Sequence, residues 1–406
     1  MQKWKDYSQH RVLWIAVTLN FISGLIYMWS VISRALIEEH GFSSKQASLP
    51  YTAFTISFVI AMVVFGKLQD AKGPRLTVSL GVVLMGSGLI LSGLFMSPTS
   101  LVVTMGIITG TGIGIINAST SPPVVKWYPP EKKGKVLGIV VAGAGLSSTI
   151  YSPLANNLIN DIGVEKTLIL IGVVALSTSV VLAQFLRNPP MDLKAGSAHI
   201  SNYMQESFDM GWRDMIRTKG FYKLWLMLGF SASAGLMIIG HISNIAKIQA
   251  GWEGGFLLVM MISIFNTAGR VIAGRLSDRM GRVNLLKVVF GIQALNMLLF
   301  QYYSTPATLA FGVAVTGACY GAAFPLFPSI VTDIYGVNNF GVNYGLVYTG
   351  WGLGGTIGPM VAAAMFDSLT SYRLAFVSAS VLMIMALVIA ATFNPGREGL
   401  FKAIDT

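Results

Sequence analysis

The sequence predicts an all-α membrane protein in which twelve transmembrane helices form two six-helix halves of similar topology. Composition is the first reason, because 53% of the 406 residues are hydrophobic and only 11% are charged, whereas soluble domains carry about 25% charged residues. So few charges cannot cover the surface of a soluble protein of this size, and the apolar excess requires lipid as its solvent. A series of long apolar stretches and an internal repeat are the other two reasons.

Each apolar stretch is long enough to cross a hydrocarbon core about 30 Å thick as a helix, whereas barrel strands would be about ten residues long. We predict spans at 11–37, 48–67, 76–97, 100–125, 134–159, 166–187, 221–247, 254–275, 284–303, 306–330, 341–366 and 371–394. The first stretch contains Tyr27, Trp29 and Arg34 and has no clear small-residue cleavage site. We therefore expect it to be retained as a span and not removed as a signal peptide.

The basic residues predict the orientation of the chain. Of the 28 lysines and arginines, 22 lie at the termini or in the breaks on one side, five lie on the other side, and Arg270 lies inside a span. The positive-inside rule then places both termini in the cytoplasm. This dispersed loop charge accounts for the net charge of +11 without nucleic acid as a partner. We expect a multi-pass, monomeric protein of a bacterial inner (plasma) membrane.

An internal repeat divides the chain. The segment 66–75 recurs at 274–282, 208 residues later, while 110–114 recurs at 317–321 and 143–150 at 350–357, both 207 residues later. Three matches at nearly one spacing indicate two related six-helix halves. We predict an N-terminal half at 1–187, a C-terminal half at 221–406, and between them a cytoplasmic linker, 188–220, with a short interfacial helix.

The loop pattern G-x-L-x-D, followed by glycine and arginine, occurs twice in register and resembles the major facilitator superfamily. The resemblance implies the major facilitator fold and a cytoplasmic charge latch made by Asp70, Arg75, Asp278 and Arg282. Several stretches, over a similarity from about 11 to 394, further resemble the oxalate/formate antiporter group and its monocarboxylate-transporting relatives: Ser23–Ser30, Lys126–Pro129, Leu326–Ser329 and Asn343–Gly345.

Arg270 is the clearest candidate for binding a ligand. It lies eight residues before Asp278, or about 12 Å along a helix, which places it near the middle of the membrane. An arginine stays charged and must be paired or hydrated there, yet all 17 acidic residues lie in breaks or near helix ends. Asn266 shares its polar helix face. We interpret Arg270 as an anion site, the alternative being a side chain that snorkels to the cytoplasmic surface, and the resemblance implies a carboxylate substrate.

His241, in the seventh span, has two interpretations that the sequence leaves open. It can donate to the substrate or carry a proton, since an unperturbed imidazole changes charge near physiological pH. It can equally be an interfacial residue near the outer surface, twenty residues after Phe221. The resemblance favours a place in the substrate cavity.

The resemblance also assigns a set of aromatic cavity residues, and the fourth span contains a polar partner at similar depth. Aromatic faces suit a short carbon skeleton, and tyrosine hydroxyls can reach a carboxylate, although interhelical or lipid packing explains any single ring equally well. The alternative for the polar partner is an interhelical hydrogen bond. These residues are Tyr27, Tyr320, Phe324, Tyr348, Trp351 and Asn117.

Trp351 departs from the oxalate-transporting relatives, which carry a lysine at the matching position. One fixed cation beside an indole suits a monoanion with an apolar body better than a compact dianion. We therefore predict alternating-access symport of a monocarboxylate such as lactate or pyruvate with a proton, and oxalate/formate-type exchange as the alternative. The proton would travel on His241 or with the substrate.

Other classes of function fit less well. An efflux pump for lipophilic cations conflicts with the charge of Arg270, and a nontransporting sensor or channel would not need two related halves. An enzyme would need a nucleophile with a base, or metal ligands, within the bilayer. With one histidine, one cysteine and no acid inside the spans, we expect neither an enzyme nor a bound metal or cofactor.

Overall fold

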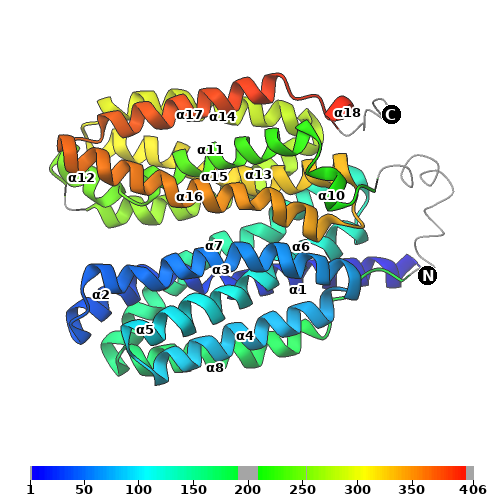
Figure 1. Cartoon of the computed structure of the whole chain (residues 1–406), viewed down its shortest axis with the longest axis horizontal. Coiled ribbons are helices and arrows are strands. Elements are labelled where there is room, and N and C mark those ends of the chain that lie inside the picture. The colour runs from blue at the N-terminus through cyan, green and yellow to red at the C-terminus, as the bar shows by residue number, and fades with distance from the viewer. Residues whose placement is uncertain (1, 191–208, 253, 399–406) are drawn as a thin grey trace. The chain divides into compact units, whose positions relative to one another are not determined.

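The computed structural model describes residues 2–190, 209–252 and 254–398 and is helical in nearly all of them (Figure 1). The first half contains α1 (Gln2–Ser23), η1 (Gly24–Met28), α2 (Trp29–His40), α3 (Ser44–Lys72), α4 (Pro74–Leu94), α5 (Pro98–Leu101), the π-helical η2 (Val102–Thr109), α6 (Gly110–Trp127), η3 (Pro130–Lys132), α7 (Lys133–Ile162) and α8 (Val164–Ala183). The second half contains α10 (Trp212–Met215), α11 (Lys219–Ile239), α12 (Ile242–Ala250), α13 (Gly255–Met280), α14 (Arg282–Leu299), η4 (Phe300–Tyr302), α15 (Pro306–Tyr335), α16 (Phe340–Leu369), α17 (Arg373–Ala391) and α18 (Pro395–Glu398).

Ten helices of the described residues are long and apolar enough to cross a membrane, and they correspond to ten of the twelve predicted spans. The first predicted span is interrupted, because a 3-10 turn, η1, separates α1 from α2. The eleventh corresponds to α16, which has the length but carries many glycines and polar aromatic residues that lower its hydropathy. The predicted all-α, multi-pass membrane fold is confirmed.

Helix ends follow recognisable local signals. Ser43 begins α3 with a capping box, in which its hydroxyl accepts from the Gln46 amide and the Gln46 side chain accepts from the Ser43 amide. The reversals after α3 and α13 need a left-handed backbone, which Gly73 (φ +82°) and Gly281 (φ +83°) supply. These two glycines are equivalent positions of the internal repeat.

The chain divides into two compact units. The first comprises Met1–Pro130, Gly143–Ser207 and Val337–Gly345, and the second comprises Glu131–Ala142, Phe208–Gly336 and Leu346–Thr406. These units differ from the predicted halves, 1–187 and 221–406, in that the beginning of α7 belongs to the second unit and the beginning of α16 to the first. Each of these two helices therefore contributes to both units.

The same packing pattern occurs within each unit. In the first, α3 packs on α6 and α4 on α8; in the second, α13 packs on α15 and α14 on α17. Some polar side chains join helices within a unit, as when Asn20 donates to Thr120 and Asn296 donates to Thr316. The repeated pairing agrees with the internal repeat of the sequence.

The short interfacial helix of the linker is predicted from Phe208, Trp212, Met215 and Ile216, of which Phe208 lies outside the described part of the chain. Beyond Phe208, one helical turn, α10, precedes α11. It is anchored to the second unit by the Met210 amide, which donates to the Tyr335 carbonyl.

Candidate substrate site

Arg270 lies in the middle of α13, ten residues before the helix ends, and only 2% of it is exposed. Its Nε donates to Asn266 Oδ1 at 2.8 Å, one helical turn earlier, and its Nη1 donates to the Val141 carbonyl at the start of α7. The guanidinium also lies over the ring of Phe324, 4.0 Å from its centroid. These partners are neutral, and in the described part of the chain no carboxylate forms an ion pair with Arg270.

An aromatic ladder, defined as Phe324, Tyr320, Trp351 and Tyr348, continues from the guanidinium. The rings of Phe324 and Tyr320 meet edge to face at 5.3 Å, and Trp351 Nε1 donates to the Tyr320 hydroxyl at 2.9 Å. Tyr348 packs on Trp351 with centroids 5.0 Å apart. The ladder joins α15 to α16, and Gly235 of α11 makes room for it, since a Cβ there would lie 2.5 Å from the Tyr320 ring.

The structure thus brings together six of the predicted site residues within the second unit. They supply one fixed positive charge, one amide and a set of apolar ring faces, a combination suited to an anion with a short apolar body. The six residues are Arg270, Asn266, Phe324, Tyr320, Trp351 and Tyr348.

His241 is not part of this set of contacts, because its hydrogen bonds go elsewhere. It lies at the break between α11 and α12, where Nε2 is 3.0 Å from the Pro359 carbonyl and Nδ1 is 3.5 Å from the Tyr372 hydroxyl. A carbonyl only accepts, so the neutral ring carries its proton on Nε2 and accepts from Tyr372 on Nδ1.

Tyr372 lies just before the span formed by α17 and accepts a hydrogen bond from Asn244 Nδ2 at 2.9 Å. Burial raises the pKa of the Tyr372 phenol, the hydrogen bond from Asn244 lowers it, and nearby Asp367 raises it further. The net pKa is above the usual value, so the hydroxyl keeps a proton to donate to His241.

Asn117 lies in the first unit, where its Nδ2 donates to the Ile113 carbonyl at 3.1 Å and lies 3.4 Å from Ser23 Oγ. These contacts match the interhelical hydrogen bond that the sequence left open as its alternative role. The side chain of Tyr27 lies outside the described part of the chain.

The second copy of the loop motif forms a cap on α7. Asp278 accepts from the amides of Gly134 and Lys135 at 2.9 and 2.8 Å, and Arg282 Nη1 donates to it at 2.9 Å. Arg282 also bonds to Asp333, whose other oxygen is 3.8 Å from Lys133 Nζ. Two acids and two cations therefore hold the first turn of α7.

The first copy forms an equivalent cap without the arginine. Asp70 accepts from the amides of Gly341 and Val342, both at 3.0 Å, at the start of α16. The predicted pairing with Arg75 is wrong, because Arg75 Nε donates to Gln184 Oε1 instead. Pro74 is an extra residue in this copy, so the arginine follows its aspartate by five positions here and by four at Asp278.

Sequence reasoning missed two parts of these arrangements. Asp333 and Lys133 were treated only as loop charges, although their position at the helix ends that face Asp278 could have indicated a network. The carbonyl of Val141 gives no side-chain signal at all. Among the described residues, no group of three histidines, cysteines or acids is placed to hold a metal ion.

Ten apolar helices long enough to cross a membrane, counted among the described residues, define a polytopic membrane protein. The chain matches the sequence model of the Major Facilitator Superfamily over residues 13–306 and 288–402. It therefore belongs to that family, and it is a transporter and not an enzyme.

Two curated relatives and one solved structure illustrate the match. The oxalate:formate antiporter of Oxalobacter formigenes is 26% identical over 93% of this chain and 89% of its own. Monocarboxylate transporter 13 of Rattus norvegicus is 25% identical over 91% and 86%. The proton:xylose symporter XylE has a TM-score of 0.76 at 12% identity, covering 96% of each chain, which is a likeness of fold alone.

Proposed function

We propose that this protein carries a small carboxylate anion across the membrane by alternating access, with Arg270 as the group that binds the carboxylate. The observation that carries the proposal is a buried guanidinium whose partners are a side-chain amide, a peptide carbonyl and an aromatic face. Such a charge is costly in the membrane without an anion. A carboxylate matches its planar fork and neutralises it.

Neutralisation of Arg270 by the carboxylate also gives a physical reason why substrate binding and the conformational change would be coupled. Closing a cavity around an uncompensated cation in a low dielectric costs several kcal/mol, whereas closing it around an ion pair with further hydrogen bonds costs much less. A bound carboxylate therefore favours the conformational change that the empty site disfavours. The names of the two curated relatives, which include carriers of oxalate, formate and monocarboxylates, support an organic anion as the substrate class.

Within that class we favour a monocarboxylate such as lactate or pyruvate. The aromatic ladder offers ring faces and one donor group, and the indole of Trp351 occupies a place at which a second cation would be needed for oxalate. One carboxylate neutralises the guanidinium completely, while a second carboxylate would stay unpaired beside apolar rings. Burying such a charge is unfavourable.

We further propose symport with a proton, carried by His241 or by the substrate. No acid lies inside a predicted span, so His241, at the break between α11 and α12, is the titratable group best placed to take part. Proton uptake at its Nδ1 would require the Tyr372 hydroxyl to turn from donor to acceptor, which links the proton to the junction between α11 and α12. The protein would work as a monomer in a bacterial inner membrane with both termini in the cytoplasm.

Uptake by purified protein in liposomes tests the proposal. Arg270→Ala and Arg270→Lys should each abolish or cripple uptake of radiolabelled lactate while the protein remains folded, because neither keeps the bidentate fork. Arg34→Ala, an exposed arginine bonded to Asn156, is the matched control and should transport normally. Full uptake by a well-folded Arg270→Ala variant would contradict the proposal.

Exchange is the second candidate, and the same liposomes distinguish it. Symport predicts that an inwardly directed proton gradient accelerates lactate uptake into liposomes without internal anion. Exchange of the oxalate:formate type predicts no response to that gradient and a strong dependence on internal formate or oxalate.

A further inference from the structure

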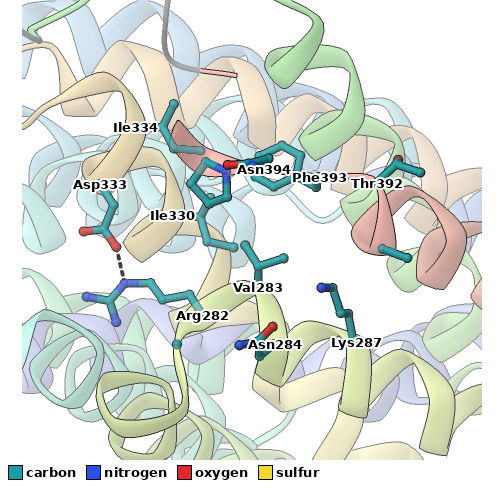
Figure 2. Close-up of a pocket in the computed structure, with 13 residues that line it drawn as sticks. Arg282, Val283, Asn284, Lys287, Ile330, Asp333, Ile334, Thr392, Phe393 and Asn394 are labelled. Carbon is teal, nitrogen blue, oxygen red and sulfur yellow. Dashed lines mark hydrogen bonds and ion pairs between the residues drawn. The ribbon is translucent and has the colours of Figure 1, made fainter. Parts of the chain in front are cut away.

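A cavity of about 600 Å³ lies in the second unit at the ends of three helices, away from Arg270 (Figure 2). Its lining comes from the first turns of α14, the last turns of α15 and the segment that joins α17 to α18. In Figure 2, Lys287 extends from α14 toward the open centre of the cavity, and Thr392, Phe393 and Asn394 lie on the far side.

The positive and negative charges that line this cavity do not balance. Asp333, the acid of its lining, already pairs with Arg282, as the dashed line in Figure 2 marks, and lies 3.8 Å from Lys133. Lys287 is half-buried, and in the described part of the chain no acid forms an ion pair with it. The cavity therefore holds one uncompensated positive charge.

A donor lies on the opposite wall. Asn394 Oδ1 accepts from the Gly396 amide at 3.1 Å, so its side-chain NH2 group remains a donor in the cavity. A lysine ammonium and an amide NH2 that line one cavity are groups that bind a phosphate oxygen. The chemistry of the cavity is thus that of a phosphate site.

Two exposed apolar stripes lead from the cavity along the surfaces of neighbouring helices. On α14 the stripe begins one residue after Lys287 and is formed by Val288, Ile292, Leu295 and Leu299, each 38–58% exposed. On α17 the stripe ends one turn before Thr392 and is formed by Val381, Ile384, Met385 and Val388. Because α14 packs on α17, the two stripes lie on adjacent helices.

We propose that this cavity binds the phosphate headgroup of an anionic phospholipid, whose acyl chains lie along the stripes of α14 and α17. Charge complementarity selects an anionic headgroup, since Lys287 is the uncompensated group. The apolar stripes select a lipid over a soluble phosphate. The basic character of the cavity agrees with the attraction of juxtamembrane lysines to anionic lipid. The inference does not depend on the transported substrate.

Native mass spectrometry of the purified full chain in detergent tests this site. We expect dioleoyl-phosphatidylglycerol to bind more tightly than dioleoyl-phosphatidylcholine. Lys287→Ala should weaken phosphatidylglycerol binding about fivefold, the effect of about 1 kcal/mol for one lysine, and Lys287→Arg should retain it. Arg279→Ala removes the same charge from an exposed position outside the cavity, and should change the affinity less than twofold.

Three outcomes would overturn the proposal. Equal weakening by Lys287→Ala and Arg279→Ala would mean diffuse attraction to basic loops and no site. Equal affinity for phosphatidylcholine would remove the role of charge. If sn-glycerol 3-phosphate binds as tightly as phosphatidylglycerol and competes with it, the site is one for a soluble phosphate.

Discussion

The two units share one framework but differ at the positions that would bind an anion. Adding 208 to the numbers of α3 gives the equivalent residues of α13, so Met62 corresponds to Arg270. The surrounding backbone is alike: a Cβ on Gly345 would lie 2.7 Å from the Met62 carbonyl oxygen, and a Cβ on Gly138 would lie 2.5 Å from that of Arg270. The same close helix packing thus supports a thioether in one unit and a guanidinium in the other.

The difference extends to the neighbours. Asn266 of α13 corresponds to Phe58 of α3, and Phe324 of α15 corresponds, 207 residues earlier, to Asn117 of α6. In the second unit, Arg270 thus has an amide on its own helix and an aromatic ring on the neighbouring helix. In the first unit, Met62 has the ring on its own helix and the amide on the neighbouring one. The close packing of these helices requires small residues only at the glycine positions. The neighbouring side chains can therefore differ between the two units without changing the packing.

The largest expected effect on lactate binding comes from replacing Arg270 with methionine, the residue at the equivalent position of the first unit. Arg270→Met should weaken lactate binding at least about 100-fold, because charge-assisted hydrogen bonds worth about 3 kcal/mol are lost. The stabilisation of the purified protein by millimolar lactate in a thermal-shift assay measures this. Met62→Leu, the control in the first unit, should bind normally. Lactate stabilisation that survives Arg270→Met would show that the asymmetry has no role in binding.

A second variant tests whether the ladder selects a single negative charge. Trp351→Lys adds a cation within the same unit and should shift the ratio of oxalate to lactate affinity about tenfold toward oxalate, since the second carboxylate then gains a partner. Trp351→Phe is the control, because it also loses the bond to Tyr320 but adds no charge. An unchanged ratio in Trp351→Lys would place the substrate away from α16.

The two helix caps give a smaller, stability-based test. Asp70→Asn and Asp278→Asn each leave one capped amide without its acceptor, but only the second also breaks an ion pair, with Arg282. Asp278→Asn should therefore cost about 1–2 kcal/mol more in the free energy of unfolding. Urea unfolding of the two variants measures the difference. Equal losses would mean that Arg282 is held by Asp333 alone.

The smallest effect on binding is expected at His241. Glutamine keeps an N–H donor toward the Pro359 carbonyl but cannot titrate, so His241→Gln should change lactate affinity less than twofold. If His241 carries the proton, the variant should lose the acceleration of uptake by a proton gradient. A normal acceleration would assign the proton to the substrate instead.

Much of the fold follows from the sequence because hydropathy and length are local quantities. Ten predicted spans correspond to apolar helices, and the repeat spacing gave the equivalent residues of the two units. The position of Arg270 along α13 followed from counting residues back from Asp278, since a continuous helix rises evenly along its axis. Its neighbour Asn266 followed from the helical period.

The rest depends on contacts between segments far apart in the chain. The bond from Trp351 to Tyr320 and the acceptor at Val141 join different helices, and no periodicity encodes them. The beginnings of α7 and α16 belong to units other than their predicted halves, because close packing at Gly134 and Gly341 decides their place. At Arg75 one inserted residue, Pro74, was enough to redirect the side chain.

The bond between Arg270 and the carbonyl of Val141 has a consequence for any arriving anion. A carboxylate that takes Nη1 displaces a neutral oxygen in favour of a charged one, which is the stronger acceptor. The Val141 carbonyl so released lies inside α7 and can still accept within that helix, but α7 loses its bond to the guanidinium of α13. Binding of an anion would then weaken the contact between α13 and the third turn of α7, while the cap on its first turn stays in place.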